Sequence, residues 1–315
     1  MADANELPGN LPHADRIRSR RLKGGVAMII ADATGLAEAE RSALESELRS
    51  ATLAIPGVDE ARVALTVAEP GRKLVAIGSG KGGVGKSTVA ANLAVALARG
   101  GKRIGLIDAD IYGPSQPTLL GSDAKPTAED DRLVPVEAHG LKFLSLGQLV
   151  SPGHALAWRG PMATGALARL VEADWGDTEL LLVDLPPGTG DVQLSLIQRS
   201  RPDGAVIVST PQDLSLIDAR RAVDLFNKTS VPVLGIIENM ATYACPHCGE
   251  VSHPFGTGGA ETAAAEMQVP FLGRLPLSLA VREASDAGRP PAASDSDEAA
   301  QFAAIAAKLW EAVAH

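Results

Sequence analysis

The sequence is poor in aromatic residues and has no long apolar run, which excludes an aromatic core and a membrane-spanning helix. Phe, Trp and Tyr make up 3% of the 315 residues, although 45% of the chain is hydrophobic, so the core must be mainly aliphatic side chains and alanine. No uninterrupted apolar stretch approaches the roughly 18 residues that a membrane-spanning helix needs. The N-terminus has no basic segment followed by an apolar one, so we expect no signal peptide and a cytoplasmic protein.

Positive charge is also scarce. The 38 acidic residues outnumber the 29 lysines and arginines, which gives a formal net charge of −9 and a pI near 5.2. Non-specific binding to nucleic acid or to an anionic membrane requires a basic surface. We therefore expect neither nucleic acid nor a membrane as a partner.

Cysteine occurs only twice, and the two occurrences are close together. Cys245 and Cys248 both lie in the segment CPHCGE. Because a reducing cytoplasm keeps thiols unpaired, we interpret this pair as available for chemistry rather than as a structural disulfide.

Short apolar runs alternate with helical stretches along most of the chain. Continuous apolar runs of this kind are typical of strands that are buried on both faces of a parallel sheet. The pattern predicts an α/β fold with a mostly parallel central sheet flanked by helices, and a final helix over residues 299–314. The predicted strands cover residues 74–79, 103–108, 180–185, 205–210, 233–238 and 271–276.

The beginning of the chain has a different pattern. Residues 1–21 are polar and are expected to form a mobile N-terminus. Residues 22–70 predict a small α+β unit, with a strand over 25–32, a helix over 38–54 and a strand over 61–67. The remaining residues, 71–315, are expected to form the large α/β domain.

A phosphate-binding loop follows the first strand of the large domain. Residues 80–87 read GKGGVGKS and match G-x-x-x-x-G-K-[ST] between a predicted strand and a predicted helix. Glycines let backbone N–H groups turn inward around phosphate oxygens, and a helix N-terminus favours an anion. The pattern predicts that Lys86 reaches the β- and γ-phosphates, that Ser87 ligates Mg²⁺, and that Thr88 contacts the α-phosphate. The predicted nucleotide-binding residues of this loop are Gly80, Lys81, Gly82, Gly83, Val84, Gly85, Lys86, Ser87 and Thr88.

Carboxylates end two of the other predicted strands. Asp108 and Asp110 lie at the end of LIDAD, and Asp184 ends LLLVD. Ligands of open α/β folds bind at this edge of the sheet. Asp184 fits a Walker-B carboxylate that holds Mg²⁺ through water. Gly188, in the loop that follows, is expected to let this loop move with the γ-phosphate.

Several motifs together carry a resemblance to a known family. The chain resembles the Mrp/ApbC family of P-loop ATPases over about residues 73–291, in the motifs GKGGVGKST, DADIYGPS, WRGPM, DLPPGTGD, STPQD, ENM and CPHCGE. This family belongs to the deviant Walker A group, with MinD, ParA and the nitrogenase iron protein. The resemblance implies a P-loop NTPase fold, ATP hydrolysis and a homodimer in which Lys81 reaches the partner subunit's nucleotide. It also implies that Asp110 positions the attacking water, that Asp108 supports the Mg²⁺ shell, and that Asn239 contacts adenine.

The two cysteines can supply only part of the ligands of a four-thiolate metal centre. Two thiolates bind one side of a metal centre, and a four-thiolate site needs two more, which a twofold-symmetric dimer would supply. The family resemblance implies a labile [4Fe–4S] cluster that bridges two subunits on Cys245 and Cys248 and is passed to apoprotein clients. Zinc bound with help from His247 or His253 is an alternative, and so is a pair of redox-active or inert thiols.

Other functions share parts of this pattern. A MinD- or ParA-like positioning ATPase would have the same loop and dimer but would not require CPHC. A reductase like the nitrogenase iron protein would also bridge a cluster, although with separated cysteines. Residues 22–70 are similar to the small MIP18-like domain that precedes the ATPase in many bacterial Mrp proteins, without its leading helix. This unit has either a role in client contact or a purely structural role.

Overall fold

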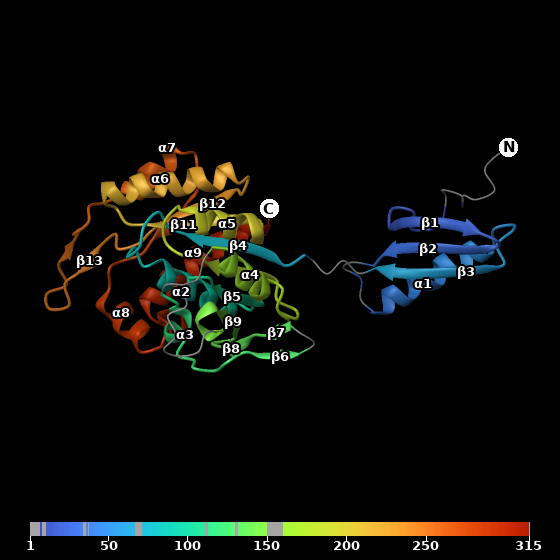
Figure 1. Ribbon diagram of the computed structural model, residues 1–315, viewed down its shortest axis with the longest axis horizontal. Coiled ribbons are helices and arrows are strands. Elements are labelled where there is room, and N and C mark those ends of the chain that lie inside the picture. Colours follow the sequence, from blue (N-terminus) through green and yellow to red (C-terminus); the bar gives the residue numbers. More distant parts are fainter. Residues whose placement is uncertain are drawn as a thin grey trace. The chain divides into compact units, whose positions relative to one another are not determined.

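The computed structural model describes residues 7, 11–33, 36, 38–66, 71–110, 113–129, 132–149 and 160–314, without the side chains of residues 160–164, 191 and 213. The chain divides into two compact units, residues 1–71 and residues 72–315 (Figure 1). Among the described residues, no helix combines the length and the apolar character needed to cross a membrane.

The N-terminal unit is a three-stranded sheet with one helix. Its elements are β1 (Ile17–Lys23), β2 (Val26–Asp32), α1 (Glu38–Leu53) and β3 (Glu60–Thr66). β1 pairs with β2 in antiparallel orientation, and β2 pairs with β3 in parallel orientation. A parallel pair requires a crossover connection, which α1 provides. Leu44 and Leu48 of α1 are buried in one cluster with Ala27 and Ile29 of β2.

One sequence-based boundary of this unit is wrong. Residues 17–21, which we placed in a mobile N-terminus, belong to β1 and pair with β2. The reason is that β1 is an edge strand rich in charged residues (IRSRRLK), whose exposed side chains hide the usual alternation of apolar and polar positions. Residues 1–6 and 8–10 of the same predicted segment lie outside the described residues.

The large unit is built on an eight-stranded sheet. Neighbouring strands are parallel except β8, which pairs with β9 in antiparallel orientation. All six predicted apolar runs are strands of this sheet, so the α/β prediction is confirmed. In spatial order the strands are β15 (Phe271–Arg274), β12 (Val233–Glu238), β11 (Gly204–Ser209), β4 (Lys73–Gly78), β10 (Leu180–Asp184), β5 (Ile104–Asp108), β9 (Leu141–Ser145) and β8 (Val136–Ala138).

Helices cover both faces of this sheet. On one face α2 (Lys86–Arg99) and α9 (Asp297–Ala314) pack over alternate strand residues such as Val75 and Leu182. On the other face, Leu74 and Leu181 lie in a second cluster, with side chains from α4 (Gly160–Val171), α5 (Asp191–Ser200), α6 (Asp213–Lys228) and α7 (Gly259–Glu266). Burial on both faces explains why the strands are continuous apolar runs rather than alternating ones.

Short elements complete the large unit, and several of them border the site described next. Figure 1 shows the β13 hairpin projecting from the part of the unit that also contains α8. These elements are α3 (Gln116–Leu119), β6 (Thr127–Glu129), β7 (Arg132–Val134), η1 (Leu146–Leu149), β13 (Tyr243–Ala244), β14 (Val251–Ser252), α8 (Leu279–Asp286) and η2 (Pro291–Ala293).

Candidate nucleotide-binding site and cysteine hairpin

The predicted phosphate-binding loop connects β4 to α2 at the carboxyl edge of the large sheet. Gly83 and Gly85 have φ angles of +80° and +79°, in the left-handed region that glycine adopts without strain. A side chain at Gly80 would meet the carbonyl oxygen of Asp218 at 2.1 Å, and one at Gly85 would meet Nδ2 of Asn239 at 2.3 Å. The loop conformation therefore requires glycine for two reasons, backbone torsion and close packing.

A cavity of about 220 Å³ opens in front of this loop. Its walls combine the loop with residues from the ends of β5 and β10, so the structure gathers side chains that are far apart in the sequence. The lining residues are Ser79, Lys81, Gly82, Gly83, Val84, Gly85, Lys86, Ser87, Thr88, Asp110 and Pro187. Gly188 adjoins this set, because its N–H donates to the carbonyl of Ser79 at 3.1 Å.

Lys86 and Asp184 form a buried ion pair beside the loop. Their side chains are 5% and 0% exposed, and Nζ of Lys86 donates to Oδ1 of Asp184. Nζ also lies 3.4 Å from Oγ of Ser87. Removing two charges from water is costly, so such a pair needs further hydrogen bonds. Asp184 receives one on its other oxygen, from Nε2 of Gln116 at 2.9 Å.

Asp108 organises the chain that follows β5. Its Oδ2 accepts hydrogen bonds from the N–H groups of Ser115 and Gln116 at 2.9 and 3.0 Å and from Oγ of Ser145 at 3.0 Å. Burial, and then the negative charge of Asp184, raise the pKa of Asp108 to about 7, although its hydrogen bonds act in the opposite direction. Asp108 therefore orders this segment through its hydrogen bonds, and its carboxyl takes up a proton at a higher pH than an ordinary aspartate does.

Lys81 has a different environment from Lys86. It is half-buried and lines the cavity, and its Nζ lies 3.5 Å from Oε1 of Gln212, immediately before α6. Its carbonyl accepts a hydrogen bond from Oγ of Ser79 at 2.9 Å. A long contact to a neutral amide restrains an ammonium group weakly, so the Lys81 side chain is held much less firmly than that of Lys86.

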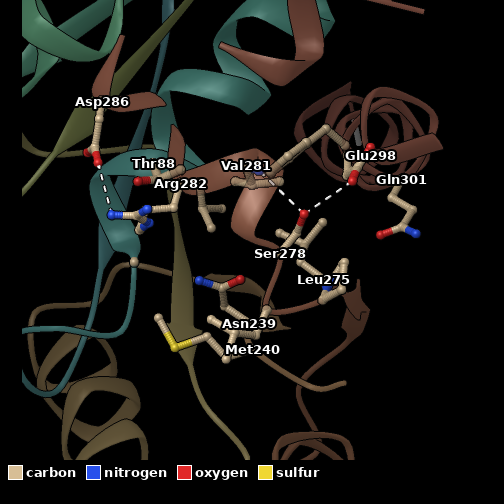
Figure 2. A pocket seen from close by; sticks show the side chains of 15 residues that line it. Thr88, Asn239, Met240, Leu275, Ser278, Val281, Arg282, Asp286, Glu298 and Gln301 are labelled. Atoms are coloured by element: carbon tan, nitrogen blue, oxygen red, sulfur yellow. Dashed lines mark hydrogen bonds and ion pairs between the residues drawn. The ribbon is translucent and has the colours of Figure 1, made fainter. Parts of the chain in front are cut away.

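A second cavity of about 240 Å³ continues from the first along α2. Figure 2 shows Asn239 and Met240 on one side of it and Ser278, Arg282 and Glu298 on the other. Nδ2 of Asn239 donates to the carbonyl of Val84 at 2.9 Å, which joins this cavity to the phosphate loop. The remaining lining residues include Gly85, Thr88, Val89, Leu275, Pro276, Leu277, Val281, Asp286, Gln301 and Phe302.

The two cysteines lie in the hairpin formed by β13 and β14, away from the residues that line either cavity. Cys245 is half-buried, Cys248 is exposed, and both are free thiols. The N–H of Cys245 donates to the carbonyl of Glu250 at 2.9 Å, and the N–H of Gly249 donates to the carbonyl of Cys245 at 2.8 Å. Backbone N–H groups of His247 and Cys248, followed by the Cys248 side chain, lower the pKa of the Cys245 thiol. This thiol is therefore disposed to act as a thiolate ligand.

At this hairpin, the described residues of one chain do not bring together enough ligands for a metal site. Within the described residues, no three His, Cys, Asp or Glu side chains converge on a common point. Nδ1 of His253 lies 3.2 Å from the carbonyl of Ala241, which occupies the ring in a contact at the base of the hairpin. Four-coordinate zinc needs two further ligands in addition to the two cysteines.

Comparison with known proteins identifies the family. The model of the family described as ParA, NUBPL iron-transfer P-loop NTPase, matches residues 71–310. The chain belongs to this family. An iron-sulfur cluster carrier protein of Deinococcus radiodurans is 48% identical to this NUBPL-type NTPase over 297 residues, which cover 90% of this chain and 84% of the relative. The sequence-based assignment to the Mrp/ApbC group of P-loop NTPases is thereby confirmed.

Two solved structures are similar to this NUBPL-type NTPase. A nucleotide-binding protein of Archaeoglobus fulgidus in complex with ADP is 39% identical, with a TM-score of 0.64 over 73% of this chain and 91% of that one. The cell division ATPase MinD of Pyrococcus furiosus is 23% identical, with a TM-score of 0.60 over 76% of this chain and 98% of that one. The second likeness establishes the fold alone.

Sequence reasoning missed several residues that the NUBPL-type fold brings to the site. Gln116 contacts Asp184, Ser145 contacts Asp108, and Gln212 contacts Lys81. The walls of the second cavity from α8 and α9 were missed as well. Gln116 follows the motif GPS directly, which was the one available signal. The other contacts depend on which strands and helices become neighbours.

Proposed function

We propose that this protein is an ATP-hydrolysing carrier of iron–sulfur clusters that works as a homodimer. The observation that carries this proposal is the combination, in one NUBPL-type chain, of a phosphate loop with a second lysine and a separate hairpin with two accessible thiols. The Deinococcus relative named as an iron-sulfur cluster carrier protein supports the cargo, and the ADP complex of the Archaeoglobus protein supports the nucleotide.

The cavity in front of the loop suits the phosphates of ATP. Lys86 would leave Asp184 for the β- and γ-phosphates, because their oxygens carry more negative charge than one carboxylate. Asp110 borders the same cavity and would position the attacking water. Asn239 lines the adjoining cavity, where the adenine would lie beyond Gly85 and Thr88.

The residues around Asp184 also fit a magnesium ion. Among the described residues, Oε1 of Gln116 and Oγ of Ser115 are buried without a hydrogen-bond partner, which leaves polar atoms next to Asp184 and Asp108 unsatisfied in the absence of ligand. Ser87 and Asp184 supply the hydroxyl and carboxylate oxygens that Mg²⁺ prefers. Bound Mg²⁺ neutralises charge on the β- and γ-phosphates during transfer. Asp108 would support this shell indirectly, through the backbone that it holds at Ser115 and Gln116.

Lys81 is proposed to act on the nucleotide of the partner subunit. Lys81 lines the cavity, and the one side-chain contact of its ammonium among the described residues is the long one to Gln212, so this ammonium is available to a second copy that packs against the cavity. A cation brought to the γ-phosphate in this way stabilises the charge that develops during hydrolysis. It also makes ATP part of the dimer interface.

The cysteine hairpin is proposed to hold the cargo. One chain has two cysteines, and a cluster bound by four thiolates needs four. Two facing hairpins would supply Cys245 and Cys248 twice and bind a [4Fe–4S] cluster between the subunits. An exposed hairpin tip leaves the cluster open to exchange with an apoprotein client.

Reconstitution tests this function directly. The protein is incubated anaerobically with iron and sulfide, its visible absorption and mass in solution are measured, and transfer to a cluster-requiring apo-enzyme is followed with and without ATP. We expect a brown dimer with one cluster per two chains, and loss of the cluster in Cys245→Ser and Cys248→Ser. A colourless protein with stoichiometric zinc, or a protein that stays monomeric with ATP and iron, would contradict the proposal.

A further inference from the structure

We propose that Gln116 is a positioning residue of the magnesium–nucleotide site, which holds Asp184 and Ser87 in place for the hydrated cation. Gln116 is the first residue of α3 and is fully buried. This inference rests on the proposed nucleotide function, because Ser87 and Asp184 are the expected magnesium ligands.

Three separate segments meet at Gln116. Its Nε2 donates to Oδ2 of Asp184 at 2.9 Å and to the carbonyl of Ser87 at 3.1 Å. Its backbone N–H donates to Oδ2 of Asp108 at 3.0 Å. One residue thus connects the start of α2 with the carboxyl ends of β10 and β5, where the phosphate loop and both strand-end carboxylates meet.

The chemistry of the amide determines its orientation. An amide nitrogen has two hydrogens and no acceptor, whereas the amide oxygen accepts only. The carboxylate of Asp184 and the carbonyl of Ser87 are both acceptors, so the group that faces them must be the NH₂ of Gln116. Both of its hydrogens are used in this way, and the side chain forms a bridge between the two expected magnesium ligands.

The oxygen of the same amide supplies the second observation. Oε1 of Gln116 is buried and has no hydrogen-bond partner among the described residues, although a buried polar atom without a partner costs stability. The amide that carries this open acceptor is bonded to Ser87 and Asp184, the residues that would hold a hydrated Mg²⁺. The burial of Gln116 therefore suits the cation-bound state better than the empty one.

The bridge also explains how Asp184 keeps its place when Lys86 leaves. In the nucleotide-free protein, Lys86 is bonded to Oδ1 of Asp184 and Gln116 to Oδ2. Phosphates would draw Lys86 away, and the carboxylate would then rely on Gln116 for its orientation. Partners of this kind orient metal ligands, and their loss lowers metal affinity by about 10-fold to 100-fold.

The test compares nucleotide binding with and without magnesium in the full-length protein. Gln116→Met keeps the volume of the side chain but removes the NH₂ donors and the amide oxygen. Titration with a fluorescent ADP analogue should give an affinity in EDTA within about twofold of wild type, whereas the Mg²⁺ concentration for half-maximal tightening should rise about 10-fold. Gln148→Met is the matched control, because in the described hydrogen bonds of that amide Oε1 accepts from the N–H of Ser145 and Nε2 donates to the carbonyl of Ala124.

Each outcome has a defined meaning. An unchanged magnesium requirement in Gln116→Met would overturn the inference, and so would an equal loss of affinity in EDTA, which indicates a general structural role. If the methionine variant does not fold, the same titration is made with Gln116→Asn, because the shorter side chain no longer reaches both Ser87 and Asp184. If wild type itself shows no effect of magnesium, the proposed nucleotide function fails before any substitution is made.

Discussion

Two lysines in one phosphate loop illustrate how burial separates the roles of identical residues. Lys86 is 5% exposed and ion-paired with a fully buried aspartate, whereas Lys81 is half-buried and, within the part of the chain that the structure describes, its ammonium makes one long contact, to Gln212. A buried cation needs a compensating anion, either Asp184 or a phosphate. A half-exposed cation has no such requirement, so Lys81 is suited to act outside its own chain.

We expect Lys81→Ala to reduce ATP turnover by about 100-fold while nucleotide affinity stays within a few-fold of wild type. The removed cation would act on the charge that develops in the reaction rather than on ground-state binding. Turnover is measured as phosphate release and affinity by calorimetry. Mixing Lys81→Ala with Lys86→Ala provides the control, because a heterodimer would contain one complete site and should recover activity. Wild-type turnover in Lys81→Ala, or no recovery on mixing, would contradict action between subunits.

Asp108 predicts an unusual pH dependence of stability. Its pKa is raised to about 7 in the folded protein, whereas an unfolded aspartate titrates near about 3.9. Between these values the folded state holds a proton that the unfolded state releases, so the contribution of Asp108 to stability falls as the pH rises through this window. Without nucleotide or Mg²⁺, Asp108→Asn should show a smaller decline of Tm from about pH 5 to about pH 8 than wild type. Parallel Tm curves for the two proteins would refute the assignment.

At the scale of elements, the cysteine hairpin is attached to the nucleotide-binding unit through Glu238. This residue ends β12 and is fully buried, and its Oε2 accepts from the N–H of Ala260 at 2.8 Å, at the start of α7. The chain between these two points contains the hairpin. The next residue along the chain, Asn239, contacts the phosphate loop through Val84. The start of the hairpin segment and the second cavity, which Asn239 lines, therefore share the end of β12.

We expect Glu238→Ala to loosen the base of the hairpin, because the N–H of Ala260 would lose its acceptor at a cost of about 1–3 kcal/mol. Hydrogen exchange should accelerate at Ala260 and at Leu277, whose N–H donates to the carbonyl of Thr242 at 2.7 Å. Glu238→Gln keeps an acceptor and should exchange like wild type. Glu261→Ala is the surface control, since Glu261 is half exposed and binds Arg274. Equal exchange in Glu238→Ala and Glu261→Ala would show that the buried carboxylate does not hold the hairpin.

At the scale of the whole molecule, exposed apolar residues lie on α6, the helix that begins directly after the Lys81 contact Gln212. Leu214 and Ile217 are three positions apart on α6 and are 71% and 48% exposed. They therefore lie on one side of the helix. The segment that carries them begins next to Gln212, the contact of Lys81. A dimer that brings Lys81 to a second nucleotide would cover this part of α6.

We expect the double variant Leu214→Glu/Ile217→Glu to weaken ATP-dependent dimerisation about 10-fold or more, because two charges would lose water in the interface. Sedimentation with ATP and Mg²⁺ measures the effect, and Tm serves as the folding control. Leu53→Glu is the matched variant, since Leu53 is 47% exposed in the N-terminal unit. If the double variant dimerises like Leu53→Glu, the proposed orientation of the dimer is wrong.

The local sequence determined the strands of the large sheet, the phosphate loop and the α/β fold class. Strands that are buried on both faces need unbroken apolar runs, and the phosphate loop needs glycine at closely spaced positions, so both requirements are visible in short stretches of sequence. Gly80, Gly83 and Gly85 carry that requirement in the sequence itself. The charged edge strand β1 escaped detection because an exposed edge imposes no apolar pattern.

Only the tertiary structure decided which side chains meet. Gln116 reaches Asp184 across 68 positions, Lys81 reaches Gln212 across 131, and Asn239 reaches Val84 across 155. These contacts follow from the order of strands in the sheet, in which β10 lies between β4 and β5 although it comes much later in the chain. Strand order is set by packing of the whole unit, and the pattern within any one segment does not contain it.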